Sequence, residues 1–166
     1  MDLISLLAGE FERELAITRR VIDAIPDDRF DWKPAEKSFS VGMLAGHLAE
    51  IPGWGMSIIT TDRFDEMGDY KPPTPASRAE VLAMLDENAG GFLQALRAAE
   101  EAALEANWVM TMSGQTFIDD RRYDVLRTWI YNHVAHHRGQ LTVYLRLLGI
   151  SVPEVYGPTA DSAMPA

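Results

Sequence analysis

The chain contains no cysteine among its 166 residues. This absence excludes disulfide bonds, thiolate metal ligands and a cysteine nucleophile, so any thiol chemistry would need a thiol from another molecule. Basic residues are scarce as well, because 15 lysines and arginines stand against 25 acidic residues and leave a net charge of −10. A nucleic-acid-binding protein must neutralise phosphates and presents a basic face, so we expect no DNA or RNA partner.

Long apolar runs are also missing. No run reaches the roughly 20 residues that a membrane-spanning helix needs, and the acidic net charge gives no attraction to anionic lipids. The chain starts with MDLISLLAGEFEREL, which lacks the basic residues and the cleavage site of a secretory signal. We therefore expect a cytoplasmic protein without a membrane partner. Its length suits a single domain over residues 1–160, followed by a tail at 161–166.

Four amphipathic stretches predict four helices. The first runs from about Leu3 to Ile25, with apolar residues at spacings of three, four or seven, and it ends at Pro26. The second begins after Ser40, which is a suitable N-cap. We expect Pro52 and the glycines that follow it to bend or interrupt this second helix.

The third and fourth helices have clear start signals. The third begins with a capping box at Ser77 and is expected to continue to Ala103. The fourth begins near Asp119 or Asp120 and runs to Leu148, where a glycine follows at the left-handed position past the helix end. With these two helices, the sequence predicts four helices in total, as in a four-helix bundle.

Two connections complete the predicted fold. The stretch NWVMTMSGQTFIDD, before the last helix, has alternating apolar residues and predicts a short hairpin or an extended loop. The connector between the second and third helices contains RFDEMGDYKPPTPAS and is long enough for a crossover instead of a tight turn. The sequence therefore predicts an all-α fold: a four-helix bundle with a long crossover connection and a short hairpin before the last helix.

Three of the four histidines lie in one stretch, YNHVAHHRGQL. His133 and His137 are four residues apart, so they share one face of a helix and can present nitrogen atoms to one cation. His136 is turned by about 100° from its neighbour, and we interpret it as a residue that either supports the ligands from behind or lies at the periphery. Two histidines rarely suffice to hold a metal, so a third ligand must come from elsewhere.

The fourth histidine, His47, lies in the apolar helical stretch VGMLAGHLAEI, where a lone imidazole would lack a polar partner. It is the only histidine left to complete a three-ligand set with His133 and His137. Neutral nitrogen ligands suit zinc, nickel, copper or iron better than calcium or magnesium. The alternative is that the histidines are ordinary core or surface groups, and spacing alone does not decide between the two.

Other side chains near these histidines are candidates for a role at the site. Glu50, three residues after His47, either orients that ring, acts as a general base or faces solvent. Gln140, three residues after the last histidine, either hydrogen-bonds a bound group or bonds to a neighbouring helix. Trp54 and Trp129 either line the mouth of the site or pack in the core.

The stretch NHVAHHRGQLTVYLRLLGI, followed by VPEVYGPTAD, resembles the C-terminal signature of the DinB-like superfamily. The similarity extends over residues 1–160. It implies a four-helix bundle that forms a homodimer and holds a divalent metal through one histidine of the second helix and two of the last. His47, His133 and His137 match these positions. The superfamily includes bacillithiol-transferase-like proteins and mycothiol-dependent maleylpyruvate isomerases.

Three functions are compatible with this resemblance. The first is a metal-dependent transferase of a low-molecular-weight thiol, or a hydrolase, with a small-molecule thiol and an electrophile as partners. The second is a non-catalytic metal-binding stress protein, and the third is a structural helical dimer whose histidines are core or interface groups. We expect zinc or nickel as the metal, with iron, manganese and copper as alternatives.

Overall fold

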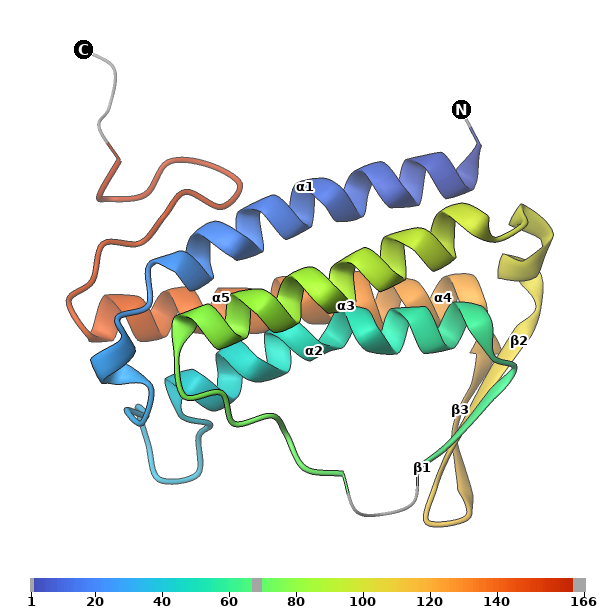
Figure 1. Cartoon of the computed structure of the whole chain (residues 1–166), viewed down its shortest axis with the longest axis horizontal. Helices are drawn as coiled ribbons and strands as arrows, with labels where there is room; N and C mark the ends of the chain where they lie inside the picture. The colour runs from blue at the N-terminus through green and yellow to red at the C-terminus, as the bar shows by residue number, and fades with distance from the viewer. Residues whose placement is uncertain (1, 67–69, 163–166) are drawn as a thin grey trace.

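The computed structural model describes residues 2–66 and 70–162, and it contains four helical rods that pack side by side (Figure 1). The fourth rod is continuous, although its middle part is a π-helix. α1 contacts α3 and α5, and α2 contacts the same two helices, so each rod has two neighbours. The prediction of four helices is confirmed. Their bounds are α1 Leu3–Asp23, α2 Val41–Thr60, α3 Arg78–Ala98, and, in the last rod, α4 Arg122–Leu126, η3 Arg127–Asn132 and α5 His133–Leu147.

The connection between α2 and α3 is a crossover. In Figure 1 these two helices run in the same direction, whereas α1 and the last rod run in the opposite one. Helices joined by a tight turn are antiparallel neighbours, so the connector must return along the length of the bundle. The long crossover expected from the sequence is therefore present. Residues 67–69 of this connector lie outside the described residues.

Side-chain caps set the starts of α2 and α3 as expected. The Ser40 hydroxyl accepts a hydrogen bond from the backbone N–H of Met43 at 3.2 Å, and the Ser77 hydroxyl accepts one from the N–H of Glu80 at 3.3 Å. The carboxylate of Glu80 reaches back to the N–H of Ala76 at 2.9 Å. Each hydroxyl pairs one N–H of a first turn that has no partner within the helix.

Three details of the predicted helices are wrong. α2 is not interrupted at Pro52, because the helix continues through this residue, and the glycines after it serve close packing: a Cβ at Gly55 would lie 2.8 Å from the ring of Phe92 on α3. α3 ends at Ala98, and the following residues form the short 3-10 helix η2 (Glu101–Glu105). The last rod begins at Arg122, later than expected, because the preceding residues belong to a strand.

The all-α prediction is also wrong, because three strands form a small mixed sheet beside the bundle. The predicted hairpin is confirmed as β2 (Asn107–Met112) paired antiparallel with β3 (Gln115–Arg121). Ser113 and Gly114 form its two-residue turn with φ values of 50° and 77°, as a type I′ hairpin turn requires. The unexpected strand is β1 (Arg63–Glu66), which comes from the crossover connector and pairs parallel with β2.

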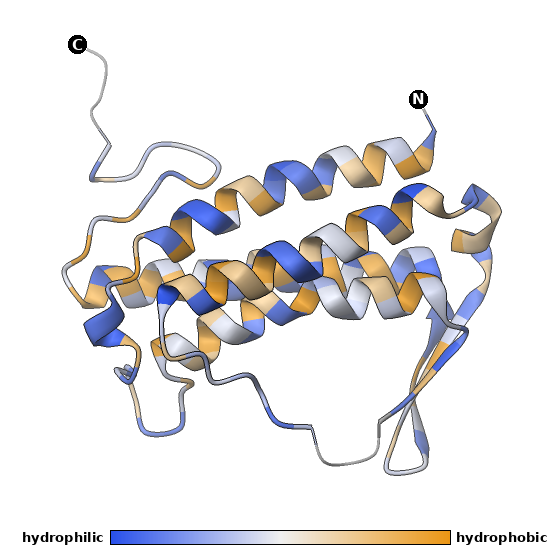
Figure 2. Ribbon diagram, viewed as in Figure 1, coloured by the Kyte–Doolittle hydropathy of each residue, from blue (hydrophilic) through white to orange (hydrophobic). Residues whose placement is uncertain are grey.

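The core lies between the four rods, and apolar residues recur along each helix at positions that alternate with polar ones (Figure 2). Phe11, Phe92 and Tyr131 meet near its centre, with Phe11 edge-on to the other two rings at centroid distances of 4.8 and 5.9 Å. Such edge-to-face pairs add stabilisation beyond burial. Among the described residues, the helices are too short or too polar to cross a bilayer.

Two expectations from the sequence stay predictions. The structure describes a single chain, so the homodimer is not tested, and neither is a domain boundary at residue 160. The expected tail at 161–166 falls mainly on residues 163–166, which lie outside the described part of the chain.

Candidate metal centre

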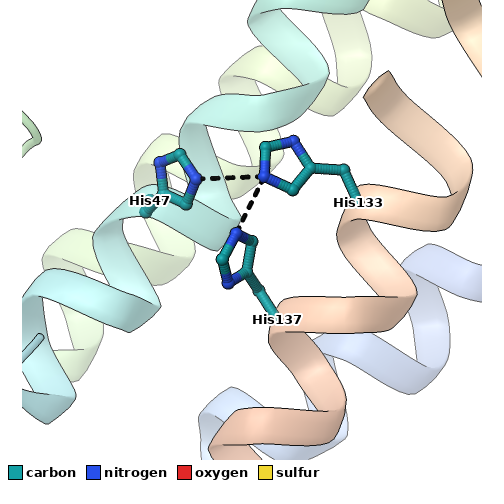
Figure 3. Close-up of side chains that lie close together, drawn as sticks. All are labelled: His47, His133 and His137. Atoms are coloured by element: carbon teal, nitrogen blue, oxygen red, sulfur yellow. Dashed lines mark hydrogen bonds between the residues drawn. The ribbon is translucent and has the colours of Figure 1, made fainter. Parts of the chain in front are cut away.

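Three histidines from α2 and α5 meet where these two helices pack (Figure 3). Nε2 of His133 lies 2.8 Å from Nε2 of His137 and 3.4 Å from Nε2 of His47. The candidate ligand atoms of the three rings all lie within 4.8 Å of one another. His47 is buried and the other two are half-buried. Folding therefore brings together side chains that are 86 positions apart in the sequence.

The second ring nitrogen of each histidine, Nδ1, has an oxygen partner. Because a carboxylate or carbonyl oxygen can only accept, Nδ1 donates the proton in each case. The neutral ring then carries its lone pair on Nε2, the atom that faces the other two histidines. The partners are Oε1 of Glu50 for His47 at 2.6 Å, Oε1 of Gln140 for His137 at 2.7 Å and the main-chain oxygen of Trp129 for His133 at 3.2 Å.

The rings of His133 and His137 do not take up a second proton at neutral pH. The pKa of His137 is lowered to about 4, mainly by burial; the hydrogen bond to Gln140 opposes this shift, and the neighbouring histidines add to it. Burial, followed by the proximity of His47, also lowers the pKa of His133. Both rings are therefore neutral near pH 7. The arrangement directs three ring nitrogens towards one point, as a metal-binding site does.

Two of the three nitrogen–nitrogen distances match those around a transition-metal ion, and the third pair, His47 and His137, lies within 4.8 Å. Zinc–nitrogen bonds of about 2.0–2.1 Å place two ligand nitrogens roughly 2.9–3.4 Å apart when the angle between the bonds is 90–109°. The distances of 2.8 and 3.4 Å from Nε2 of His133 span nearly the same range. Neutral imidazoles are also the donor type that zinc, nickel, copper and iron prefer. The residues present fit such an ion.

Local helix geometry positions His133. The π-helical segment η3 ends at Asn132, immediately before this residue. A π-helix interrupts the regular i→i+4 hydrogen-bond ladder and is frequent at functional sites. Here the carbonyl of Trp129, inside the segment, accepts the hydrogen bond from the His133 ring. Sequence reasoning did not identify this carbonyl, because a main-chain acceptor leaves no trace in residue identities.

Glu50 orients the His47 ring and does not face solvent. Its side chain is 13% exposed, and Oε1 accepts hydrogen bonds both from His47 and from the hydroxyl of Tyr70. Burial, and then the bond to Glu50, raise the pKa of Tyr70, so this hydroxyl stays protonated and keeps donating. Of the three roles considered for Glu50, the geometry favours orientation of a ligand.

Two further residues considered for the site are Gln140, which contacts the cluster, and His136, which does not belong to it. The side chain of Gln140 bonds to the ring of His137 on its own helix, not across to a neighbouring helix. His136 is exposed, with its ring centroid 4.8 Å from that of His137. It lies outside the cluster, as its position on the helix indicated.

An apolar cavity of about 320 Å³ adjoins the cluster, and His133 is one of the residues that line it. Trp54 and Trp129 line it too, with ring centroids 5.8 and 6.2 Å from that of His133. Both tryptophans also pack against the core, so each of the two roles considered for them is partly correct. Tyr70 was missed at the sequence level, since its place depends on the path of the crossover connector.

Comparison with known proteins agrees with the sequence resemblance. A model of the DinB family matches residues 3–164. The uncharacterized protein YrdA of Bacillus subtilis (strain 168) is 24% identical over 157 residues, covering 94% of this chain and 88% of YrdA. A DinB-like protein from Bacillus cereus ATCC 10987 superposes with a TM-score of 0.67 at 25% identity, covering 89% of this chain and 94% of the other. The DinB-like protein YjoA from Bacillus subtilis superposes with a TM-score of 0.71 at 18% identity, covering 90% of this chain and 97% of YjoA. This similarity shows a shared fold.

Proposed function

This chain belongs to the DinB family, and from its site we propose that it binds one divalent transition-metal ion through His47, His133 and His137. The observation that carries the proposal is the convergence of three Nε2 atoms whose Nδ1 partners all donate to oxygen atoms. Histidine ligands in metal sites are oriented by such outer acceptors. Zinc and nickel suit this donor set, with iron, manganese and copper as alternatives.

Three protein ligands leave room for another molecule at the ion, as catalytic metal sites require. When bound, a divalent ion supplies the Lewis acidity that turns a water molecule or a small-molecule thiol into a stronger nucleophile. The chain's own residues hold the three rings in place, keep Nε2 of His133 and His137 unprotonated and provide an apolar space beside His133.

The reaction that we propose is transfer of a low-molecular-weight thiol to an electrophile, or a related hydrolysis. Because the chain has no cysteine, the sulfur must come from a cosubstrate. In the transfer, the sulfur forms a bond to an electrophilic carbon, the leaving group departs with its bonding electron pair, and the thiol proton passes to solvent. Glu50 is already engaged by His47 and Tyr70, so we assign it a positioning role.

Elemental analysis of the protein purified without an affinity tag tests the metal site. We expect one ion per chain, and calorimetric titration of the metal-stripped protein with zinc should give the same stoichiometry. His137→Ala should lose this binding, whereas the matched control His136→Ala should keep it, because His136 is exposed and outside the cluster. If the two variants bind zinc alike, or if the unaltered protein neither binds nor is stabilised by any of these metals, the histidines are structural groups.

A second measurement separates a catalyst from a passive metal binder. The metal-loaded protein is incubated with a panel of small thiols and an electrophilic chlorinated arene, and thioether formation is followed. We expect turnover that disappears in the stripped protein and in His137→Ala. Full metal occupancy without turnover on any thiol, or on hydrolysable esters, would instead fit the non-catalytic function.

A further inference from the structure

The cavity beside His133 lies between three parts of the chain, and most of its lining residues have no other role at the candidate metal centre. Its walls come from the second half of α2, from the last rod around η3 and from one face of the three-stranded sheet. Trp54 and Trp129 form the wall next to the histidines, and Trp108 forms the wall on the sheet side. The sheet therefore closes a space that the four helical rods alone would leave open.

The strands present an unusual number of apolar side chains to this space. Along β2, Trp108, Met110 and Met112 follow the two-residue period of a strand and all line the cavity. On β3, however, the consecutive residues Phe117 and Ile118 both line it, although regular strand neighbours point to opposite faces. The pairing explains this. Met110 is opposite Ile118 and Thr111 is opposite Thr116, so Phe117 is a bulged residue without a partner.

The chemistry of the lining selects an uncharged occupant. Among the described residues, the lining contains no lysine, arginine, aspartate or glutamate. Of its polar groups, the Trp108 indole donates to Thr61 and the Tyr70 hydroxyl donates to Glu50, so both are already engaged. Among the described residues, the Ser57 hydroxyl and the indole N–H groups of Trp54 and Trp129 have no hydrogen-bond partner, so these uncharged groups can bond to a ligand. A charged group would lose its hydration here without a counter-charge.

The size of the cavity suits a small organic molecule. An apolar cavity of about 150 Å³ already accommodates benzene, and this one measures about 320 Å³. Phe64 and Phe117 line it and are 43% and 54% exposed, so they form a rim through which a ligand can enter. Exposed aromatic side chains around an apolar space are typical of ligand sites.

We propose that this cavity binds the uncharged, apolar body of a substrate, an aromatic or branched aliphatic group, and directs its reactive atom past His133 towards the three Nε2 atoms. The second half of this statement rests on the proposed function, because it needs a metal ion at the cluster. The first half rests on the cavity alone. The substrate class is thus a hydrophobic electrophile or hydrophobic thiol, and not a sugar, a nucleotide or a charged metabolite.

Binding of a neutral fluorescent probe, N-phenyl-1-naphthylamine, to the metal-stripped full chain tests the apolar body. The probe should bind the unaltered protein, and its affinity should fall about tenfold in Phe64→Ala/Phe117→Ala, which removes both rim rings. The matched control Leu6→Ala/Leu147→Ala changes two side chains that are 50% and 61% exposed but do not line the cavity. Its affinity should stay within about twofold of that of the unaltered protein.

Circular dichroism checks that each variant is folded. If the rim variant loses structure, Met110→Gln, which places an amide in the lining at similar volume, serves the same purpose and should weaken probe binding. Equal probe affinity in the unaltered protein and in every folded cavity variant overturns the proposal, as does the absence of probe binding to the unaltered protein.

A pair of thiols tests the direction of the reactive atom. Benzyl mercaptan and ethanethiol share the CH2–SH group and differ in a phenyl ring against a methyl group. In the cobalt-loaded protein, both should change the visible absorption of cobalt, with benzyl mercaptan at least about tenfold tighter. The rim variant should reduce this ratio, because it removes contacts to the ring alone.

The metal-binding and the cavity-binding experiments can fail independently of each other. If cobalt and zinc do not bind but the probe binds and is weakened by the rim variant, the proposed function is wrong and the cavity assignment stands. If metal binds with the expected stoichiometry but benzyl mercaptan shows no advantage and the probe does not bind, the metal site stands and the cavity assignment is overturned.

Discussion

α5 contributes to two polar clusters on different sides: one around Arg138 and one formed by the three histidines. The two clusters differ in how their polar groups are paired. Arg138 is 1% exposed, and its guanidinium faces α1, where it bonds to the carboxylate of Glu14 at 2.6 Å and to the Thr18 hydroxyl at 3.1 Å. Its neighbour His137 faces α2 and meets two other histidines that offer only lone pairs. The first cluster contains both a cation and its anion, whereas the second contains three nitrogen donors, for which we propose a metal ion from solution.

The Arg138 cluster also fastens the C-terminal segment to the bundle. Tyr156 bonds to the carboxylate of Glu14 at 2.8 Å, contacts the guanidinium through its hydroxyl, and lies with its ring centroid 5.1 Å from the guanidinium carbon. Only Nε of Arg138 is buried without an acceptor among the described residues. We propose that one face of α5 serves stability and the other serves metal binding, and substitutions can test this separation.

The largest effect is expected from Arg138→Met. Removing one partner of a buried ion pair leaves Glu14 without its counter-charge, which lowers the free energy of unfolding by about 3–5 kcal/mol. Urea denaturation measures this loss. Zinc stoichiometry should stay at one per chain in the folded variant. In the exposed pair of Arg19 with Asp86, Arg19→Met should cost less than about 1 kcal/mol, and equal losses at both sites would contradict the contrast.

The next effect is the stabilisation by zinc itself. At a free zinc concentration of 100 times the dissociation constant, ligand binding to the native state adds about 2.7 kcal/mol to the free energy of unfolding. Thermal unfolding with and without zinc should show this gain in the unaltered protein and in Arg138→Met. His47→Ala should show none. A zinc-dependent gain that survives in His47→Ala would mean that the ion binds elsewhere.

Glu50→Gln should weaken the metal site without unfolding the chain. The variant retains an oxygen acceptor for Nδ1 of His47 but loses the negative charge that makes this ring a better donor, so zinc affinity should fall about tenfold. Competition with a colorimetric chelator measures the change. Glu87→Gln makes the same charge change at an exposed position of α3 and should leave the affinity unaltered.

The smallest effects come from two hydroxyl deletions, one in each cluster. Tyr156→Phe removes the bond to Glu14 and should lower the free energy of unfolding by about 1 kcal/mol with no change in zinc affinity. Tyr70→Phe removes a donor to Glu50 and should alter zinc affinity about two- to fivefold at nearly constant stability. A reversed outcome, with Tyr156 affecting zinc and Tyr70 affecting stability, would remove the distinction between the two faces.

Local signals allowed most of the helical fold to be predicted. Ser40, Ser77 and Gly149 marked helix ends correctly because capping depends on the nearest few residues. β1 was not predictable in this way, since its partner strand is far along the chain, with Arg63 opposite Val109. The proline-rich connector around it gave no strand pattern, and only the folded bundle brings the two segments into register.

For the site as well, features set by neighbouring residues could be predicted, whereas contacts between distant segments could not. The four-residue spacing of His133 and His137 fixed their common face, and His47, the only histidine left for the set, also matched the family resemblance. The partners of Arg138 come instead from α1 and from the C-terminal segment, and no local pattern connects these regions. The cavity could not be predicted from the sequence either, because its walls come from the sheet, the bulge at Phe117 and α2, which are distant in the chain.

The crossover topology has a consequence for how the protein matures. His47 is made early, whereas its two companions belong to the last helix that the structure describes, so a growing chain on the ribosome carries α1, α2 and α3 before the trio can exist. Domains generally fold as units, so the complete bundle requires this last helix. If an ion binds as we propose, it can bind only after α5 has docked, and it would then stabilise this last contact of the bundle.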